Sequence, residues 1–179
     1  MNTLPHRFSI VGTSGSGKST LGRALAARLG VAFIELDSIR HQANWVELPD
    51  PEFRSRVAGL VEGERWVIDG TYAVVRDLVW DRATTIVWLD LPRWQVMLQV
   101  IWRSVSRAAT CAVLWNGNRE RWSMLLTAEH PIRWAWRTYH GRKRHYEAAL
   151  DARWVRLRSR AEVRRWLDGM AREDRGAGR

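Results

Sequence analysis

Short apolar segments alternate with segments of helical spacing along most of the chain. Five segments have the length and composition of buried strands, at residues 7–11, 31–36, 66–68, 84–89 and 153–157. Apolar residues recur at helical spacing in the intervening ranges, which are 19–29, 52–63, 73–80, 92–107, 119–128, 131–150 and 161–170. Strands that alternate with helices predict an α/β fold, in which a mostly parallel sheet carries helices on both faces.

Two irregular stretches interrupt this alternation. Residues 37–51 follow the second strand and contain two prolines, and residues 108–118 follow the long helix after the fourth strand. The chain of 179 residues contains no internal repeat and no linker long enough to divide it. We therefore expect a single domain over residues 1–170, followed by a disordered polar tail at 171–179.

The loop between the first strand and the first helix carries the most specific signal. Residues 12–19 read GTSGSGKS and match the pattern G-x-x-x-x-G-K-[ST] at every fixed position. Glycines let successive backbone N–H groups point at phosphate oxygens, and the helix that follows directs its positive end to the same place. We therefore expect this P-loop to bind a nucleoside triphosphate, with ATP as the cofactor, through Gly12, Thr13, Ser14, Gly15, Ser16, Gly17, Lys18, Ser19 and Thr20.

Two carboxylates are candidates for the metal that accompanies the phosphates. The Ser19 hydroxyl is suited to a Mg²⁺ site, while Lys18 reaches the β- and γ-phosphates. Asp69 ends an apolar strand and is followed by Gly70, which is the usual context of a second Mg²⁺ ligand. Asp90 also follows a strand, but the Leu-Pro pair after it favours a helix cap. We therefore predict a Mg²⁺ site made of Ser19 and Asp69.

The charge balance points to anionic ligands. The chain has 29 Lys+Arg against 19 Asp+Glu, and lysine occurs only at Lys18 and Lys143. Because arginine binds phosphate and carboxylate through paired hydrogen bonds, the excess fits either a phosphate pocket or a nucleic-acid surface. Weak nucleic-acid binding would use the basic run at residues 142–145, for which the alternative interpretation is a solvated helix face.

Other sequence features bear on class and location. The single cysteine, Cys111, excludes an intramolecular disulfide, and no signal-peptide pattern or apolar run of membrane-spanning length is present. We therefore expect a cytoplasmic protein without a membrane partner; the sequence leaves the oligomeric state open. Twelve tryptophans are expected mostly in the core or along an internal cleft. The absence of an Asn-Lys-x-Asp segment argues against a GTPase.

The chain resembles the adenylate-kinase-like P-loop kinases, and within them the small proteins labelled DNA topology modulation proteins. The resemblance covers about residues 7–170 and rests on the P-loop together with ELDS at 35–38, VIDGTY at 67–72, VWLDLPR at 87–93 and WNGNRE at 115–120. It implies a three-layer P-loop NTPase fold with a five-stranded parallel sheet in the order 2-3-1-4-5. It also implies an acceptor-binding region after the second strand and a short lid after the fourth.

The resemblance also implies roles for individual residues. Asp37 would orient an acceptor hydroxyl or take its proton, for which the alternative is an N-cap or an Asx turn. Arg54, Gly70 and Arg76 would bind the acceptor. Arg103 would lie on the adenine base, and Arg107, Arg119 and Arg137 would reach the transferring phosphate.

The leading hypothesis is an ATP-binding small-molecule kinase. It would transfer the γ-phosphate of ATP to a nucleotide, a nucleoside or another small hydroxyl or phosphate acceptor. The alternative is a nucleotide-dependent DNA-binding or topology-modulating regulatory protein that has no small-molecule acceptor. A third possibility is an ATP-binding protein with weak hydrolysis. The apolar composition of residues 108–115 departs from long-lid adenylate kinases and indicates a different acceptor or a lid that packs on a partner.

Overall fold

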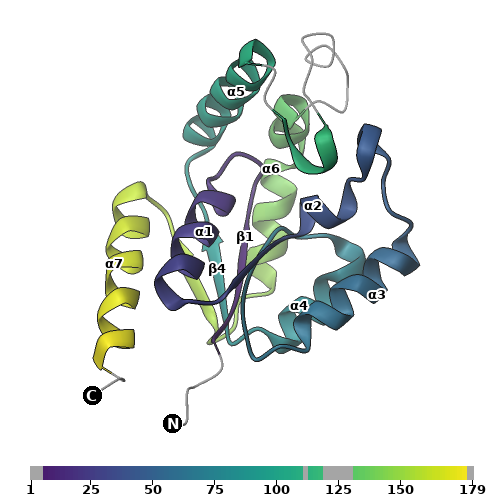
Figure 1. The fold of residues 1–179 in the computed structure, drawn as a ribbon. Helices are drawn as coiled ribbons and strands as arrows, with labels where there is room; N and C mark the ends of the chain where they lie inside the picture. Colours follow the sequence, from purple (N-terminus) through teal and green to yellow (C-terminus); the bar gives the residue numbers. More distant parts are fainter. Residues whose placement is uncertain (1–5, 111–112, 119–130, 177–179) are drawn as a thin grey trace.

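A five-stranded parallel sheet forms the centre of the molecule (Figure 1). The computed structural model describes residues 6–110, 113–118 and 131–176. The strand order β2-β3-β1-β4-β5 confirms the order implied by the family resemblance. The strands are β1 (His6–Gly12), β2 (Ala32–Glu35), β3 (Arg65–Asp69), β4 (Thr85–Leu89) and β5 (Trp154–Leu157). All neighbouring pairs are parallel, so the carboxyl ends of the strands, where the P-loop and Asp69 lie, meet at one edge.

Side chains of the central strands alternate between two apolar layers. Val11 of β1 packs on one side, whereas Phe8 and Ile10 pack on the other. The same alternation places Trp66 and Val67 of β3 in opposite layers. Burying a large apolar side chain contributes about 1.5–3 kcal/mol. Because both faces are buried, these strands read as continuous apolar runs in the sequence.

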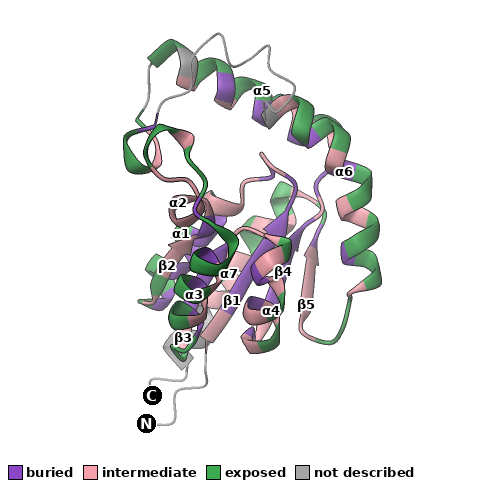
Figure 2. Cartoon of the chain, turned by 90° about the vertical axis from the view of Figure 1, so that its right-hand side faces the viewer, coloured by how far each residue is buried: buried purple, intermediate pink, exposed green. Residues whose placement is uncertain are grey.

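Helices cover both faces of the sheet. On one face, the apolar residues of α1 (Lys18–Leu29) and α7 (Arg160–Gly176) contact the strands. The opposite face is covered by α3 (Asp50–Val61), by the 3₁₀ turn η2 (Ala73–Val75) with α4 (Arg76–Arg82), and by Tyr146 of α6 (Pro131–Ala148). Buried residues accordingly concentrate along the central strands β1, β3 and β4 (Figure 2). The predicted three-layer α/β architecture is confirmed.

A separate apolar cluster joins α5 (Arg93–Thr110) to α6 above the carboxyl edge of the sheet. Val96 and Val100 of α5 pack there with Ala135 and Tyr139 of α6. Much of the surface of the same two helices is exposed (Figure 2), and Trp94, Trp102, Trp134 and Trp136 are among its exposed residues. These four are exceptions to the expectation that most of the tryptophans lie in the core or along a cleft. Among the described residues, no helix is long and apolar enough to span a bilayer.

The largest departure from the sequence prediction lies after β2. The stretch at 37–51, expected to be irregular, begins with α2 (Leu36–Arg40) and continues through the 3₁₀ turn η1 (Ala43–Trp45). Buried Leu36 anchors α2, which no periodic pattern in so short a segment reveals. At the other end of the chain, α7 continues to Gly176, six residues beyond the predicted end at Met170. The single domain over residues 1–170 stays a prediction.

Candidate active site

The P-loop has the backbone conformation that phosphate binding needs. Gly15 and Gly17 have φ values of 81° and 94°, in the left-handed region that favours glycine. A Cβ atom on Gly15 would lie 2.1 Å from Cγ2 of Val100, because α5 packs directly on the loop. Gly17 stands immediately before α1, so the first N–H groups of this helix face the loop. The loop is therefore ready to accept phosphate oxygens at a helix N-terminus.

Lys18 lies at the centre of a group of charged side chains. Its Nζ donates to the backbone carbonyl of Thr13 at 3.3 Å. Burial is the main reason why the pKa of Lys18 lies below its ordinary value, and the charges of Arg142 and Arg103 act in the same direction. The carboxylates of Asp69 and Asp37 raise this pKa. The fold thus brings five charged residues together from separate parts of the chain.

Ser19 and Asp69 meet across the interface between α1 and β3. The Ser19 hydroxyl donates to Oδ2 of Asp69 at 2.5 Å, and Asp69 is only 4% exposed. Burial raises the pKa of Asp69, while Lys18 and the bond from Ser19 lower it. Its Oδ1 is buried and has no hydrogen-bond partner among the described residues. A hard cation such as Mg²⁺ fits this hydroxyl and carboxylate pair, since it takes oxygen ligands and leaves several waters in place.

Asp37 is the second residue of α2, and its charge acts on Lys18. Its Oδ1 accepts a 2.6 Å hydrogen bond from the hydroxyl of Tyr72, which follows β3. Burial and the neighbouring carboxylate raise the pKa of Tyr72, so the phenol stays a neutral donor. Gly70 lies between Asp69 and Tyr72, and a Cβ there would come within 3.2 Å of Cβ of Leu36. This close contact holds the end of β3 against the start of α2.

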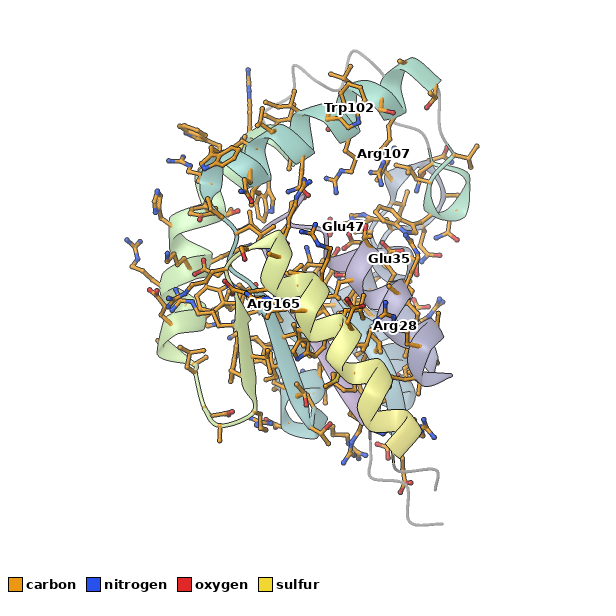
Figure 3. All side chains as sticks on the ribbon, turned by 90° about the vertical axis from the view of Figure 1, so that its left-hand side faces the viewer. Arg28, Glu35, Glu47, Trp102, Arg107 and Arg165 are labelled. Atoms are coloured by element: carbon orange, nitrogen blue, oxygen red, sulfur yellow. The ribbon has the colours of Figure 1, made fainter. Side chains whose placement is uncertain are left out.

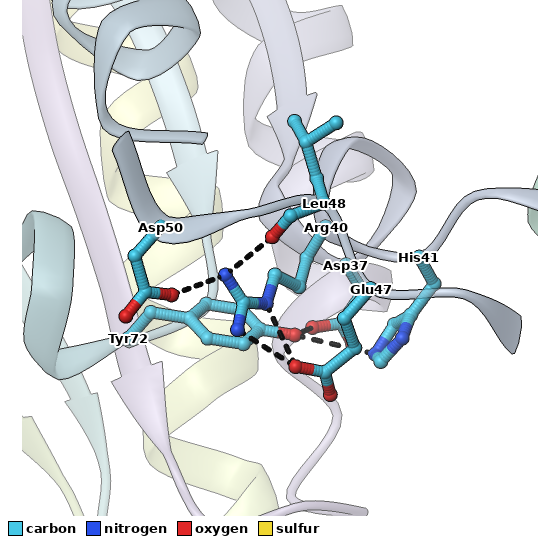
Figure 4. A network of polar contacts seen from close by, with 7 residues as sticks. All are labelled: Asp37, Arg40, His41, Glu47, Leu48, Asp50 and Tyr72. Carbon is cyan, nitrogen blue, oxygen red and sulfur yellow. Dashed lines mark hydrogen bonds and ion pairs between the residues drawn. The ribbon is translucent and has the colours of Figure 1, made fainter. Parts of the chain in front are cut away.

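The loop at residues 38–48 is named the acceptor loop here, after the role that the family resemblance implies for it. It is held by a polar network beside Asp37 (Figure 4). Arg40 binds Glu47 and Asp50 in ion pairs of 2.7 and 2.6 Å and donates to the carbonyl of Leu48. Nε2 of His41 lies 3.5 Å from the Tyr72 hydroxyl. The loop also closes through backbone bonds from Gln42 to Val46 and from Leu48 to Arg40. The side chain of Arg40 thus stabilises the conformation of the acceptor loop.

Two arginines of α5, Arg103 and Arg107, lie in the half of the helix that follows its contact with the P-loop. Arg103 donates to Oγ of Ser14 at 3.2 Å, so it lies beside the phosphate loop. This position favours contact with phosphate over the predicted stacking on adenine. Arg107, one turn further along α5, is half-buried, and Figure 3 shows its side chain on the side of the helix that faces the body of the molecule. Its predicted role at the transferring phosphate stays a prediction.

Four other arginine predictions have different outcomes. Arg54 forms an ion pair with Asp77 and donates to the carbonyl of Val74. Arg76 contacts Nε2 of His145 at 2.6 Å, on the face of α6 that meets α4. The geometry therefore gives no support to acceptor binding by Arg54 or Arg76. Arg137 is exposed on α6, and Arg119 lies outside the described residues.

Arg142 is the site residue that the sequence interpretation missed. It was placed in a basic run at the surface, but its Nη1 lies 3.4 Å from the carbonyl oxygen of Gly12. Its neighbour Lys143 lies 3.7 Å from the buried carboxylate of Asp90. Asp90 binds Arg156 as well, so it is an ion-pair residue here, where a helix cap was expected. Two members of the run thus face the interior, which weakens the case for a nucleic-acid surface.

The comparisons with known proteins point to kinases. The family model for shikimate kinase matches residues 14–50, which include most of the P-loop and the whole acceptor loop. A shikimate kinase from Synechococcus elongatus is 24% identical over 135 residues, which cover 64% of this chain and 71% of that protein. A shikimate kinase from Paramagnetospirillum magneticum is 44% identical over 59 residues, or 33% of this chain and 30% of that protein.

Solved structures share the fold over nearly the whole chain. A gluconokinase from Sinorhizobium meliloti has a TM-score of 0.57 at 19% identity, covering 98% of this chain and 97% of its own. A shikimate kinase from Acinetobacter baumannii in complex with shikimate has a TM-score of 0.59 at 21% identity, covering 94% and 91%. These matches do not support the DNA topology modulation group, and nucleic-acid binding stays a prediction. The chain is an ATP- and Mg²⁺-dependent phosphotransferase, a small-molecule kinase of the adenylate-kinase-like P-loop fold that is similar to the shikimate kinases.

Proposed function

We propose that this kinase phosphorylates a hydroxyl oxygen of a small acceptor bound at Asp37. The observation that carries the proposal is the position of Asp37. It is hydrogen-bonded to Tyr72 and close enough to Lys18 for its charge to raise the pKa of the ammonium group. An acceptor hydroxyl at Asp37 would therefore lie next to the γ-phosphate held by the P-loop. Shikimate and gluconate are the first acceptors to test, given the names of the matched kinases.

In the proposed reaction, different residues act on the acceptor and on the phosphates. The acceptor oxygen forms a bond to the γ-phosphorus while the bond from that phosphorus to the β–γ bridging oxygen breaks, and ADP leaves. Asp37 orients the acceptor hydroxyl and takes its proton. Lys18 and Arg103 stabilise the negative charge on the phosphate oxygens. Mg²⁺ bound at Ser19 and Asp69 would supply further charge neutralisation at the β- and γ-phosphates.

An acceptor screen tests the proposal. The purified chain would be incubated with Mg²⁺ and ATP, and ADP release would be followed with shikimate, gluconate, nucleosides, nucleoside monophosphates and small alcohols. We expect one class of hydroxyl compound to accelerate ADP release well above basal hydrolysis, and mass spectrometry to find one added phosphoryl group on it. Lys18→Ala is the control, because it removes the phosphate-binding ammonium group and leaves the Asp37 side intact.

Two outcomes would count against the proposal. If no acceptor raises ADP release above the basal rate, hydrolysis alone would be the activity. If the product carries the new group on an existing phosphate, the acceptor would be a nucleotide and not a hydroxyl compound. A salt titration of DNA binding, with and without ATP, addresses the regulatory alternative, which requires binding that depends on the nucleotide and not only on ionic strength.

A further inference from the structure

The segment after α5 is bound to the acceptor loop by the side chain of Asn118. This residue is 4% exposed. Its Oδ1 accepts from the backbone N–H of Trp45 at 2.9 Å, and its Nδ2 donates to the carbonyl of Gln42 at 2.8 Å. One amide group thus satisfies a donor and an acceptor of the loop. Breaking either bond would leave a buried polar group without a partner, which is costly.

Asn116 adds a second attachment in the same turn. Its Nδ2 donates to the carbonyl of His41 at 2.6 Å and to that of Ser38 at 3.2 Å. The turn itself is closed by a backbone hydrogen bond, in which the N–H of Leu114 donates to the carbonyl of Asn118 at 2.7 Å. Asn116 has a φ of 54°, a conformation that asparagine tolerates better than most residues. The WNG part of this segment, the 3₁₀ turn η3 (Trp115–Gly117), is therefore shaped to present both amides to the acceptor loop.

The attachment continues to Asp37 through His41. The Trp115 ring is stacked on the His41 ring, with centroids 6.2 Å apart and an interplanar angle of 24°. Nε2 of His41 lies 3.5 Å from the Tyr72 hydroxyl, which in turn donates to Asp37. The backbone N–H of His41 also donates to the carbonyl of Asp37 at 3.0 Å. A change in the position of the turn would thus reach the side chain and the backbone of Asp37.

We propose that residues 113–118 belong to the acceptor-binding half of the site, and that Asn116 and Asn118 are positioning residues for Asp37. This assignment differs from the sequence expectation, in which residues 108–118 belong to a short lid after the fourth strand. The assignment rests on the proposed function, because that function gives Asp37 its role at the acceptor. The hydrogen bonds that couple the two segments do not depend on the proposed function. The acceptor loop and the turn form one body, while the P-loop takes no part in these bonds.

Hydrogen exchange on the full chain tests the coupling without any acceptor. Asn118→Leu keeps the size of the side chain and removes both bonds. We expect the backbone amides of residues 38–48 and 113–118 to exchange about tenfold faster together, because two buried hydrogen bonds are lost. We expect ADP with Mg²⁺ to bind with unchanged affinity. If only residues 113–118 exchange faster, or if the ADP affinity falls tenfold while the acceptor loop is unaffected, the proposal is wrong.

A matched pair of glycine substitutions guards against misfolding of the leucine variant. Asn116→Gly removes the amide and keeps the positive φ. Asn44→Gly makes the same change at a residue of the acceptor loop with a φ of 60°, for which the described part of the chain shows no side-chain bond to the turn. Faster exchange in both segments for Asn116→Gly alone supports the proposal. Equal effects of the two substitutions would overturn it, because general loop flexibility would then explain the result.

The kinetic readout separates positioning from a purely structural role. With the acceptor found by the screen, we expect Asn116→Gly to raise its KM and lower kcat several-fold, and to leave the KM for ATP unchanged. A rise in the KM for ATP instead would place the turn in the donor half and contradict the proposal. If the screen finds no acceptor, the proposed function fails, and the exchange and ADP-binding results still decide the assignment of the turn.

Discussion

The donor half and the acceptor half of the proposed site are built in different ways. The donor half is a contiguous loop at residues 12–19, whose glycines and helix N-terminus supply backbone groups to the phosphates. The acceptor half is assembled from distant segments through side chains. Tyr72 reaches Asp37 across 35 positions, and Asn116 reaches His41 across 75. Local geometry therefore fixes the first half, and tertiary packing fixes the second.

This difference explains how one donor site can serve many acceptors. Backbone N–H groups are present whatever the side chains are, so phosphate binding by the P-loop tolerates substitutions in the surrounding residues. In contrast, the acceptor half depends on particular pairs of hydrogen-bonded residues, such as Asn118 with Trp45. Both residues of such a pair can change together without disturbing the P-loop. Substitutions in the two halves should accordingly separate effects on ATP binding from effects on turnover. The substitutions are taken in order of expected effect, with the largest first.

Asp69→Asn should have the largest effect and should move activity and stability in opposite directions. Loss of the charge at the proposed Mg²⁺ site is expected to lower turnover about 1,000-fold, equivalent to several kcal/mol of transition-state stabilisation. Burial raises the pKa of Asp69, so its contribution to the free energy of unfolding falls as the pH rises through the folded pKa. Without Mg²⁺, the neutral asparagine should therefore raise Tm at pH 7 and lose this advantage in acid.

The measurement is a series of thermal melts without metal between pH 4 and pH 8, together with steady-state kinetics. The exposed Asp81→Asn is the matched control and should change neither Tm nor turnover. A lower Tm for Asp69→Asn at pH 7 would mean that the bond from Ser19 and the charge of Lys18 outweigh the cost of burial.

Asp37→Asn should reduce turnover and leave ATP binding almost intact. Removal of a general base typically lowers kcat by about 100-fold or more. Asparagine still accepts the hydrogen bond from Tyr72 through Oδ1, so the acceptor loop should keep its conformation. Calorimetry of ADP with Mg²⁺ would measure the donor half, and acceptor-dependent ADP release the acceptor half. Equal losses in both measurements would show that the halves are not separable.

The local part of the site was predictable from sequence because each of its signals spans few residues. The P-loop pattern and the apolar strand before it lie within residues 7–19. Likewise, the strand before Asp69 is three buried residues followed by Asp-Gly. The short helix α2 was missed because it is stabilised by contact of Leu36 with the distant end of β3 at Gly70. No periodicity within five residues encodes such a contact.

The arginines show why the remaining site residues were harder to assign. Arg54 and Arg76 stand near the acceptor region in sequence, but each is bound elsewhere, to Asp77 and to His145. Their partners lie 23 and 69 positions away, so the choice depends on how helices pack. Arg142 had a usable signal, since it stands three residues after Tyr139 and four before Tyr146, both buried. This spacing places it on the inner face of α6.

Arg142→Met should weaken nucleotide binding more than it affects the acceptor half. Its guanidinium lies beside Gly12 and its charge acts on Lys18, so its removal takes positive charge away from the phosphate site. We expect about tenfold weaker binding of ADP with Mg²⁺, the loss of one charge-assisted contact. Arg144→Met removes the same charge from the exposed face of the same helix and is the control. Equal losses of ADP affinity in the two variants would indicate a general electrostatic effect of the net charge. High salt would then abolish both losses.

Tyr72→Phe should have the smallest effect on turnover, and its effect should be attributable to a single hydrogen bond. The substitution removes one hydroxyl that donates to Asp37, and one such hydrogen bond contributes about 1 kcal/mol, or roughly fivefold. We expect a fivefold loss in acceptor-dependent kcat with the ADP affinity unchanged. Because burial and Asp37 raise the pKa of Tyr72, the loss should be the same from neutral pH to pH 10, with no alkaline limb from this phenol.

Tyr139→Phe provides the matched control for that result. Its hydroxyl donates to the carbonyl of Leu91 at 2.9 Å, within the cluster that joins α5 to α6. The same atom is removed from a buried phenol, so the loss of stability should be similar, but kcat should not change. If both substitutions lower kcat equally, the effect of Tyr72 reports stability alone. A loss of ADP affinity in Tyr72→Phe would show instead that the acceptor half helps to shape the P-loop, and the two halves would have to be treated as one unit.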